Sequence, residues 1–148
     1  MRRVLVLGCP GAGKSTLARS LGEALSLPVV HLDKLWWKSG WINRTEGEFD
    51  ALLDAVLLGE EWVIDGNYLR TLPRRLERCD AVVLLDYPRR VCLFRALRRT
   101  LTCRGRTRPD MAADCPDRLA GASARWLRDF PHPPPPPTLQ PRAGCQAG

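Results

Sequence analysis

Residues 8–16 read Gly8-Cys9-Pro10-Gly11-Ala12-Gly13-Lys14-Ser15-Thr16, and this stretch decides the fold because it matches the phosphate-binding pattern G-x-x-x-x-G-K-S/T. The run before it, Val4-Leu5-Val6-Leu7, is short, apolar and typical of a buried parallel strand. After it, apolar residues recur at helical spacing through residues 14–26. A strand therefore ends where a helix begins, a context that a chance match of the pattern would usually lack.

The residue types in this loop suit the binding of a nucleotide phosphate. Glycines let backbone N–H groups turn toward the phosphate, and the N-terminus of the following helix adds partial positive charge. We expect Lys14 to reach the outer phosphates and the Ser15 hydroxyl to bind Mg²⁺. The sequence therefore predicts a site for ATP or GTP with Mg²⁺.

Length and composition limit the class of protein. The 148 residues are 45% hydrophobic, which suits one domain with one core. The apolar run within residues 1–9 is too short for a signal peptide. No other apolar run approaches the ~18 residues that are needed to cross a bilayer. We therefore expect a cytoplasmic protein without membrane contact. The 6 cysteines include no C-x-x-C pair and there are only 2 histidines, so neither a zinc site nor a disulfide framework is expected.

Arginine dominates the net charge of +7, and many arginines gather in residues 89–108. This cluster has two interpretations: a cationic lid over a nucleotide, since arginine grips phosphate oxygens bidentately, or a nucleic-acid-binding patch. A GC-rich genome would explain the frequency of arginine but not its clustering.

Carboxylates follow three of the predicted strands. Apolar runs predict strands at residues 3–7, 28–32, 62–64 and 81–85, and the last three are followed by Asp33, Asp65 and Asp86. Ligands of open α/β sheets bind outside the carboxyl ends of the strands. The recurrence favours Mg²⁺ and substrate contacts, although each aspartate alone also suits a turn or a helix cap.

Helices and loops fill the remaining sequence up to residue 130. Helical spacing predicts helices at 45–59, which opens on the capping-box pattern Thr45-Glu46-Gly47-Glu48, and at 90–101, with a short basic helix or turn at 69–78. Residues 102–110 carry glycine and arginine and predict a mobile lid.

Three tryptophans lie in residues 34–41, which we expect to form an irregular surface excursion. Two interpretations of this flap stay open. Its rings can form a pocket for a planar acceptor, or they can pack the flap onto the sheet.

Taken together, these blocks resemble the adenylate-kinase-related P-loop kinases often labelled DNA topology modulation proteins. The resemblance implies an α/β fold of three layers, of the nucleoside-monophosphate-kinase type, with a parallel sheet of about four strands, flanking helices and an Arg-rich lid. It covers almost all of residues 1–130 in order, through GCPGAGKSTLA (8–18), HLDKLWWKSGW (31–41), WVIDGNY (62–68), LLDYPRR (84–90) and RGRTRPDM (104–111).

The resemblance also implies roles for individual residues. Asp33 is similar to the acidic residue that related kinases place beside the acceptor, and Asp65 to the aspartate that orients Mg²⁺-bound water. Arg104, Arg106 and Arg108 resemble lid arginines that neutralise the transferring phosphoryl group, so the catalytic set is Lys14, Asp33 and these three arginines. The metal residues are Ser15 and Asp65, and the nucleotide-binding residues are Gly8, Gly11, Ala12, Gly13, Lys14, Ser15 and Thr16.

The carboxyl end departs from the family pattern. Relatives continue past Phe130 into another helix and a fifth parallel strand, whereas here residues 131–148 are proline-rich and lose apolar periodicity. We expect a kinase-like domain at 1–130 and a disordered tail at 131–148, the result of a truncation or frameshift, with an incomplete adenine pocket.

The resulting functional prediction is an ATP-dependent phosphotransferase, a monomer that acts on a small-molecule acceptor. The alternative is a nucleotide-binding regulator associated with DNA topology, without kinase activity. A third interpretation is an isolated phosphate-binding module that hydrolyses ATP slowly or not at all.

Overall fold

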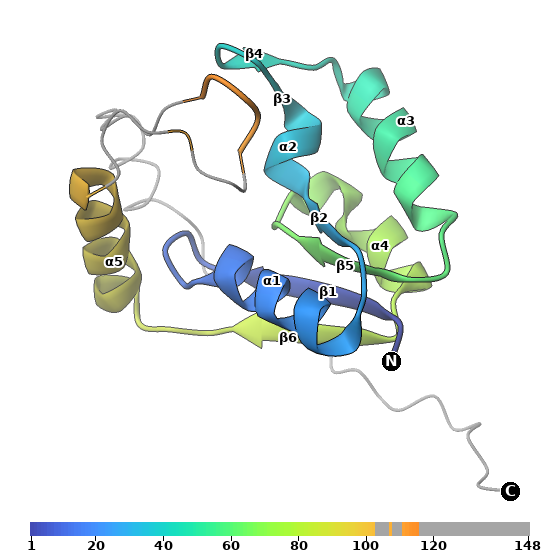
Figure 1. Ribbon diagram of the computed structural model, residues 1–148, viewed down its shortest axis with the longest axis horizontal. Helices are drawn as coiled ribbons and strands as arrows, with labels where there is room; N and C mark the ends of the chain where they lie inside the picture. The colour runs from blue at the N-terminus through green and yellow to red at the C-terminus, as the bar shows by residue number, and fades with distance from the viewer. Residues whose placement is uncertain (103–106, 108–110, 116–148) are drawn as a thin grey trace, which may run out of the picture.

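The computed structural model describes residues 1–102, residue 107 and residues 111–115 of the chain. Figure 1 shows strands and helices that alternate along most of this part. In chain order the elements are β1 (Arg3–Gly8), α1 (Lys14–Leu25), β2 (Val29–His31), α2 (Leu32–Trp36), β3 (Trp37–Lys38), β4 (Ile42–Asn43), α3 (Glu46–Leu57), β5 (Trp62–Asp65), the 3-10 helix η1 (Leu69–Thr71), α4 (Leu72–Arg78), β6 (Ala81–Leu85) and α5 (Arg89–Thr102).

Four parallel strands form the main sheet in the order β2-β5-β1-β6. This confirms the predicted α/β fold with a parallel sheet of about four strands. The register places Asp65 of β5 opposite Val6 of β1 and opposite His31 of β2. The carboxyl ends of three strands therefore meet beside the loop that follows β1.

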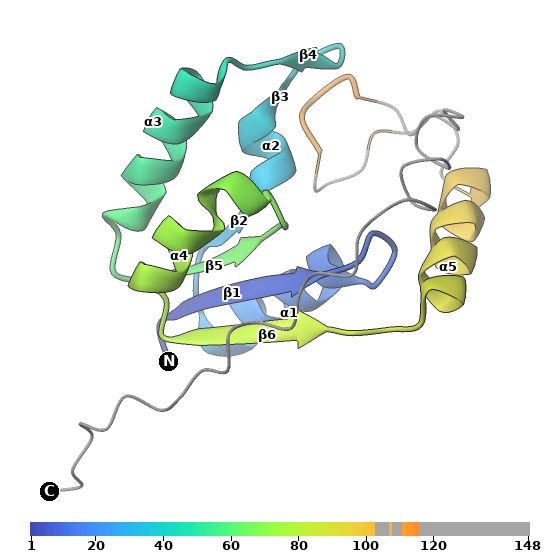
Figure 2. The same cartoon turned by 180° about the vertical axis from the view of Figure 1, so that it is seen from behind.

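Strand β1 supplies side chains to both faces of the sheet. Val4 and Val6 belong to one buried cluster with Ala18 of α1, whereas Leu5 belongs to a second cluster with Phe49 of α3. This alternation follows from the two-residue period of a strand. Figures 1 and 2 show α1 on one face and α4 on the other, so helices cover both faces as the three-layer prediction requires.

A disulfide joins Cys9 in the loop after β1 to Cys92 in α5. The expectation that no disulfide is present was therefore wrong. The two cysteines are 83 residues apart and carry no local spacing signal. They become neighbours because β6 pairs with β1 and places the start of α5 beside the loop.

The tryptophan flap is more regular than predicted. Its first part forms α2, and β3 and β4 form a two-stranded antiparallel hairpin. Arg44 Nη1 donates to the carbonyl oxygens of Lys34, Leu35 and Trp37 at 3.0–3.2 Å, which satisfies backbone acceptors at the end of a very short helix. The expectation of an irregular excursion missed this cap, which Arg44 supplies from beyond the hairpin.

Packing, the second interpretation of the flap, accounts for its ring contacts. The Trp36 ring lies edge-on to Phe49 at 5.5 Å and tilted to Tyr68 at 6.2 Å between centroids. The Trp37 and Trp41 rings meet edge-on at 5.1 Å. Trp36 therefore packs against the core between the sheet and α3.

Several predictions lie outside the described residues. These are the lid arginines Arg104, Arg106 and Arg108, the domain boundary at residue 130 and the tail at 131–148. Residues 111–115 are described and lie against the flap, where Ser39 Oγ donates to Asp114 Oδ2 at 2.9 Å. Within the described ranges, no helix is long and apolar enough to cross a membrane.

Candidate functional site

The loop between β1 and α1 brings Gly8 through Thr16 together at one edge of the sheet, as the motif predicts. Gly13 precedes α1 with φ of 90°, a left-handed conformation that glycine adopts without strain. Gly11 has φ of 84°, and a Cβ there would lie 2.3 Å from the Cys92 carbonyl oxygen. The close approach of α5 to the loop therefore requires glycine. Lys14 Nζ donates to the Cys9 carbonyl oxygen at 3.1 Å, back across the loop.

Ser15 and Asp65, the two predicted metal residues, are in direct contact. Ser15 Oγ donates to Asp65 Oδ2 at 2.6 Å, and the same oxygen lies 2.9 Å from His31 Nδ1. Asp65 and His31 are 5% and 7% exposed, so these bonds are shielded from water. Asp65 Oδ1 is buried and has no hydrogen-bond partner among the described residues.

The orphaned Oδ1 atom fits a cation at this position. A buried carboxylate oxygen without a partner is costly, and Mg²⁺ prefers carboxylate and hydroxyl oxygens, with phosphates and water completing its shell. No group of three or more His, Cys, Asp or Glu side chains in the described ranges could hold a metal ion by itself. Ser15 and Asp65 therefore suit a metal that arrives with a nucleotide and takes most ligands from its phosphates.

Asn67 ties the segment after β5 to the end of β1. Its Nδ2 donates to the Gly8 carbonyl oxygen at 2.8 Å, and its Oδ1 accepts from the Gly8 N–H at 3.2 Å. Both backbone polar groups of Gly8 are thereby satisfied by one side chain. The asparagine lies inside the WVIDGNY block, but its pairing with the phosphate-binding loop was not predicted.

Asp33 lies with Tyr68 on the flap side of the site. Tyr68 Oη donates to Asp33 Oδ1 at 2.8 Å, and the Tyr68 ring stacks on Phe49 at 5.2 Å between centroids. Burial, together with the adjacent Asp33 carboxylate, strongly raises the pKa of Tyr68. The phenol therefore stays protonated and donates to the carboxylate.

The structure thus places the predicted site residues in two connected groups. Ser15 and Asp65 form the first, next to the loop that carries Lys14. Asp33 belongs to the second, and only two residues of chain separate Asp65 from Tyr68, the partner of Asp33. Asp86 lies at the exposed end of β6. The sequence assigned no role to His31, Asn67, Tyr68 or Arg75. The first three lie inside the blocks HLDKLWWKSGW (31–41) and WVIDGNY (62–68), whereas no signal pointed to Arg75.

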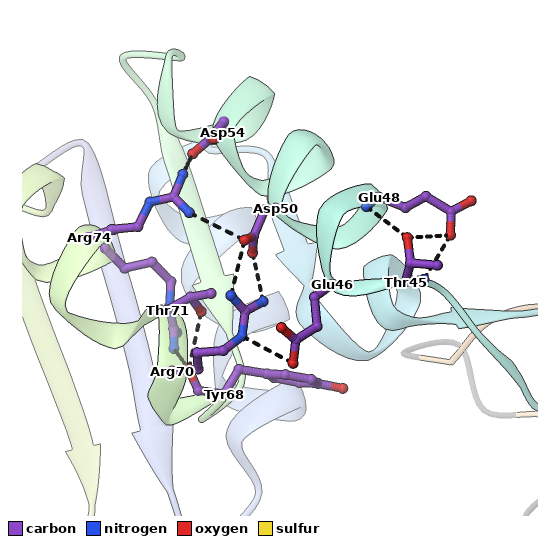
Figure 3. A network of polar contacts seen from close by, with 10 residues as sticks. Thr45, Glu46, Glu48, Asp50, Asp54, Tyr68, Arg70, Thr71 and Arg74 are labelled. Carbon is purple, nitrogen blue, oxygen red and sulfur yellow. Dashed lines mark hydrogen bonds and ion pairs between the residues drawn. The ribbon is translucent and has the colours of Figure 1, made fainter.

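Surface ion pairs connect α3 with the helices that follow Tyr68. Arg70 Nη1 and Nη2 donate to Asp50 Oδ2 and Oδ1 at 3.0 and 2.7 Å, and Arg74 pairs with Asp50 and Asp54 (Figure 3). Hydrogen bonding from Arg70 lowers the pKa of the Asp50 carboxyl. These pairs link α3 to η1 and α4.

Helix α3 begins as predicted. Thr45 Oγ1 accepts from the Glu48 N–H at 3.2 Å, and the Thr45 N–H donates to Glu48 Oε2 at 2.7 Å, which forms the predicted capping box (Figure 3).

Known proteins with similar sequences are kinases. A shikimate kinase of Corynebacterium efficiens is 35% identical over 126 residues, which cover 76% of this chain and 71% of that protein. An adenylate kinase isoenzyme 6 homolog of Caenorhabditis elegans is 29% identical over 84 residues, covering 57% of this chain and 41% of that protein. No protein-family model matches the chain.

A solved structure shares the fold. The crystal structure of a shikimate kinase from Aquifex aeolicus has a TM-score of 0.50 to this chain at 20% sequence identity, and the match covers 84% of this chain and 76% of that one. At this identity the likeness concerns the fold alone.

Proposed function

The chain belongs to the P-loop kinases, the family of the shikimate kinase with which it shares 35% identity, and we propose that it transfers the γ-phosphoryl group of ATP to a small hydroxyl- or phosphate-bearing acceptor. The observation that carries this proposal is the contact between Ser15 and Asp65 beside the phosphate-binding loop, with an unpartnered carboxylate oxygen among the described residues. This arrangement supports a binding site for a cation that arrives with the nucleotide.

In this proposal the loop residues bind and orient the nucleotide. The backbone N–H groups of the loop and the N-terminus of α1 hold the phosphates, and Lys14 exchanges the Cys9 carbonyl for the outer phosphates. Ser15 and Asp65 hold Mg²⁺, which when bound neutralises phosphate charge. Gly8, Gly11, Ala12, Gly13 and Thr16 complete the proposed nucleotide contacts.

The acceptor is proposed to bind at Asp33. Tyr68 holds this carboxylate from one side, so Asp33 presents a fixed acceptor of hydrogen bonds to the incoming hydroxyl and positions it for transfer. Positioning and electrostatic stabilisation account for most of the catalysis in phosphoryl transfer. The lid arginines Arg104, Arg106 and Arg108 are proposed to close over the site, exclude water and stabilise the charge of the transferring group.

The localisation of the protein, its oligomeric state and a role with DNA are also proposals. We place the protein in the cytoplasm, as a monomer. A role in DNA topology follows only from the family resemblance. Measurement of DNA affinity against salt tests it, since use of DNA predicts a steep loss of affinity with salt that is the same in the Lys14→Ala variant.

An acceptor screen tests the proposed function. Release of ADP from MgATP is measured with shikimate, with nucleoside monophosphates and with a panel of small polyols, using wild-type protein and the Asp33→Asn variant. We expect one class to raise ADP release in the wild type, and Asp33→Asn to reduce that stimulation by about 100-fold. ADP release that no acceptor stimulates would contradict the proposal and favour slow ATP hydrolysis.

A further inference from the structure

We propose that Arg75 is a positioning residue, whose buried guanidinium fixes the segment Asp65-Gly66-Asn67-Tyr68 and so aligns the metal side of the site with its acceptor side. The roles of these two sides rest on the proposed function. The placement of the segment by Arg75 rests on contacts within the chain and is tested separately.

Arg75 is an unusual core residue. Its side chain belongs to α4 and is 0% exposed, and it pairs with no carboxylate in the described part of the chain. Burial lowers the pKa of its guanidinium to about 10. An apolar side chain of similar length would avoid the cost of burying a charge, so hydrophobic packing alone does not explain an arginine here.

Three successive backbone carbonyls accept hydrogen bonds from its two terminal nitrogens, whereas its Nε–H is buried and has no partner among the described residues. Arg75 Nη1 donates to the Gly66 oxygen at 2.8 Å, and Nη2 donates to the oxygens of Tyr68, at 2.9 Å, and of Asn67. The planar fork of a guanidinium can reach several acceptors at fixed angles, which an ammonium group cannot do. The carbonyls of this segment therefore converge on one rigid donor.

The backbone of this segment includes one unfavourable conformation, at Tyr68. Gly66 has φ of 133°, and Tyr68 has φ of 32°, in the left-handed region that non-glycine residues rarely occupy. Such a conformation persists only when surrounding contacts enforce it. Arg75 supplies such contacts at three carbonyls, and Thr71 adds two at the last of them, since its N–H and its Oγ1 donate to the Tyr68 oxygen at 3.0 and 3.1 Å.

Three of the four residues in this segment contact different parts of the site. The Asp65 carboxylate accepts a hydrogen bond from Ser15, and the Asn67 side chain bonds both backbone polar groups of Gly8. The Tyr68 hydroxyl donates to Asp33. One buried cation thus sets the relative positions of the loop, the metal residue and the acceptor carboxylate. Displacement of the turn would move all three together.

The ionisation of Tyr68 reports on its position without any nucleotide or acceptor. In a Tyr87→Phe background, Tyr68 is the only tyrosine of the 148-residue chain, so ultraviolet absorbance of phenolate follows it alone. The variants are Arg75→Met, Arg75→Lys and the matched control Arg74→Met. Arg74 lies one residue away, and its side chain is 42% exposed. Circular dichroism at each pH identifies the range in which each variant is folded.

We expect Arg75→Met to lower the pKa of Tyr68 toward about 10, the value of a solvated tyrosine, Arg75→Lys to lower it less, and Arg74→Met to leave it unchanged. The direction is informative, because removal of a nearby cation would by itself raise the pKa of a phenol. A fall therefore reports loss of burial and of the bond to Asp33. In turnover of the acceptor found by the screen, we expect Arg75→Met to reduce kcat by about 100-fold, with a smaller change in KM for ATP.

A folded Arg75→Met or Arg75→Lys variant in which Tyr68 ionises as in the background would overturn the proposal. It would also be overturned if neither variant folds, since Arg75 would then be a requirement of the core and not a positioning residue. Failure of the acceptor screen would remove the proposed function but leave the Tyr68 titration as it stands, so the two failures are distinguishable.

Discussion

The Ser15 hydroxyl donates to Asp65 Oδ2 over 2.6 Å and so joins the first turn of α1 to the carboxyl end of β5. The contact leaves Asp65 Oδ1 buried and unpartnered among the described residues. A metal ion bound with ATP would give this oxygen the partner that it lacks. The pair therefore connects the fold directly to the proposed chemistry.

The first prediction concerns this carboxylate. Asp65→Asn keeps the shape of the side chain but removes its charge, so we expect the gain in ATP affinity that Mg²⁺ provides to fall by about tenfold or more. Calorimetric titration with ATP, in Mg²⁺ and in chelator, measures this gain. Asp54→Asn is the control, since it changes a half-exposed aspartate on α3, outside the predicted site. An equal gain in wild type and Asp65→Asn would rule out the metal role of Asp65.

The second prediction concerns the contact between the loop and α5. In Gly11→Ala the new Cβ would meet the Cys92 carbonyl oxygen at 2.3 Å, at a φ of 84° that alanine disfavours. We expect a loss of about 1–3 kcal/mol in the free energy of unfolding, measured in urea. The control Gly47→Ala lies in α3 with open space around its Cβ, and we expect it to stabilise by about 0.5–1 kcal/mol. Equal effects of the two substitutions would contradict this account.

The third prediction concerns the disulfide. Cys9 and Cys92 close a loop of 83 residues, so opening the bond increases the entropy of the unfolded chain. We expect a dithiol reductant to lower the free energy of unfolding by about 2–4 kcal/mol. The same reductant is expected to leave the double variant Cys9→Ser, Cys92→Ser unaffected. If the reductant leaves the denaturation midpoint of the wild type unchanged, the bond does not contribute to the stability of the fold.

The fourth prediction concerns stability in acid. Asp80 accepts hydrogen bonds from the Arg3 guanidinium and from the backbone N–H groups of Arg2 and Arg3, which lower its pKa to about 2. A depressed folded-state pKa stabilises the fold above the unfolded pKa, and this contribution is lost as the pH falls from about 4 to about 2.

The Asp80→Asn variant tests this linkage. We expect it to be less stable than wild type at neutral pH by about 1 kcal/mol, since the pair is partly exposed, and to show a flatter loss of stability below pH about 4. The loss does not vanish, because bonding to Lys38 also lowers the pKa of Glu48 to about 2. Denaturation midpoints against pH measure both effects. Parallel curves for the two proteins would contradict the assignment to Asp80.

Local patterns in the sequence were sufficient for the sheet and for the phosphate-binding loop. The apolar runs around Leu5 and Ile64 predicted buried strands, and the capping-box pattern predicted the start of α3 at Thr45. These features depend on neighbours within a few residues. Parallel topology then follows because helices separate the strands.

Contacts between separate elements could not be predicted in the same way. The Cys9–Cys92 bond, the cap that Arg44 places on α2 and the carbonyl contacts of Arg75 join residues whose proximity arises only after folding. An arginine bound to backbone carbonyls has no partner residue type that a sequence pattern could reveal. Asp33 was predicted at a strand end, but its bond to Tyr68 depends on how the flap packs.

The most direct test of the central claim, that these residues form a MgATP site, is calorimetric titration of the 148-residue chain with MgATP, alongside Lys14→Ala. The account predicts saturable binding by the wild type and a loss of about 10–100-fold in affinity in the variant, as expected for removal of a charged hydrogen-bond donor. A folded wild-type chain that does not bind MgATP, or that binds it equally well without Lys14, would contradict the account.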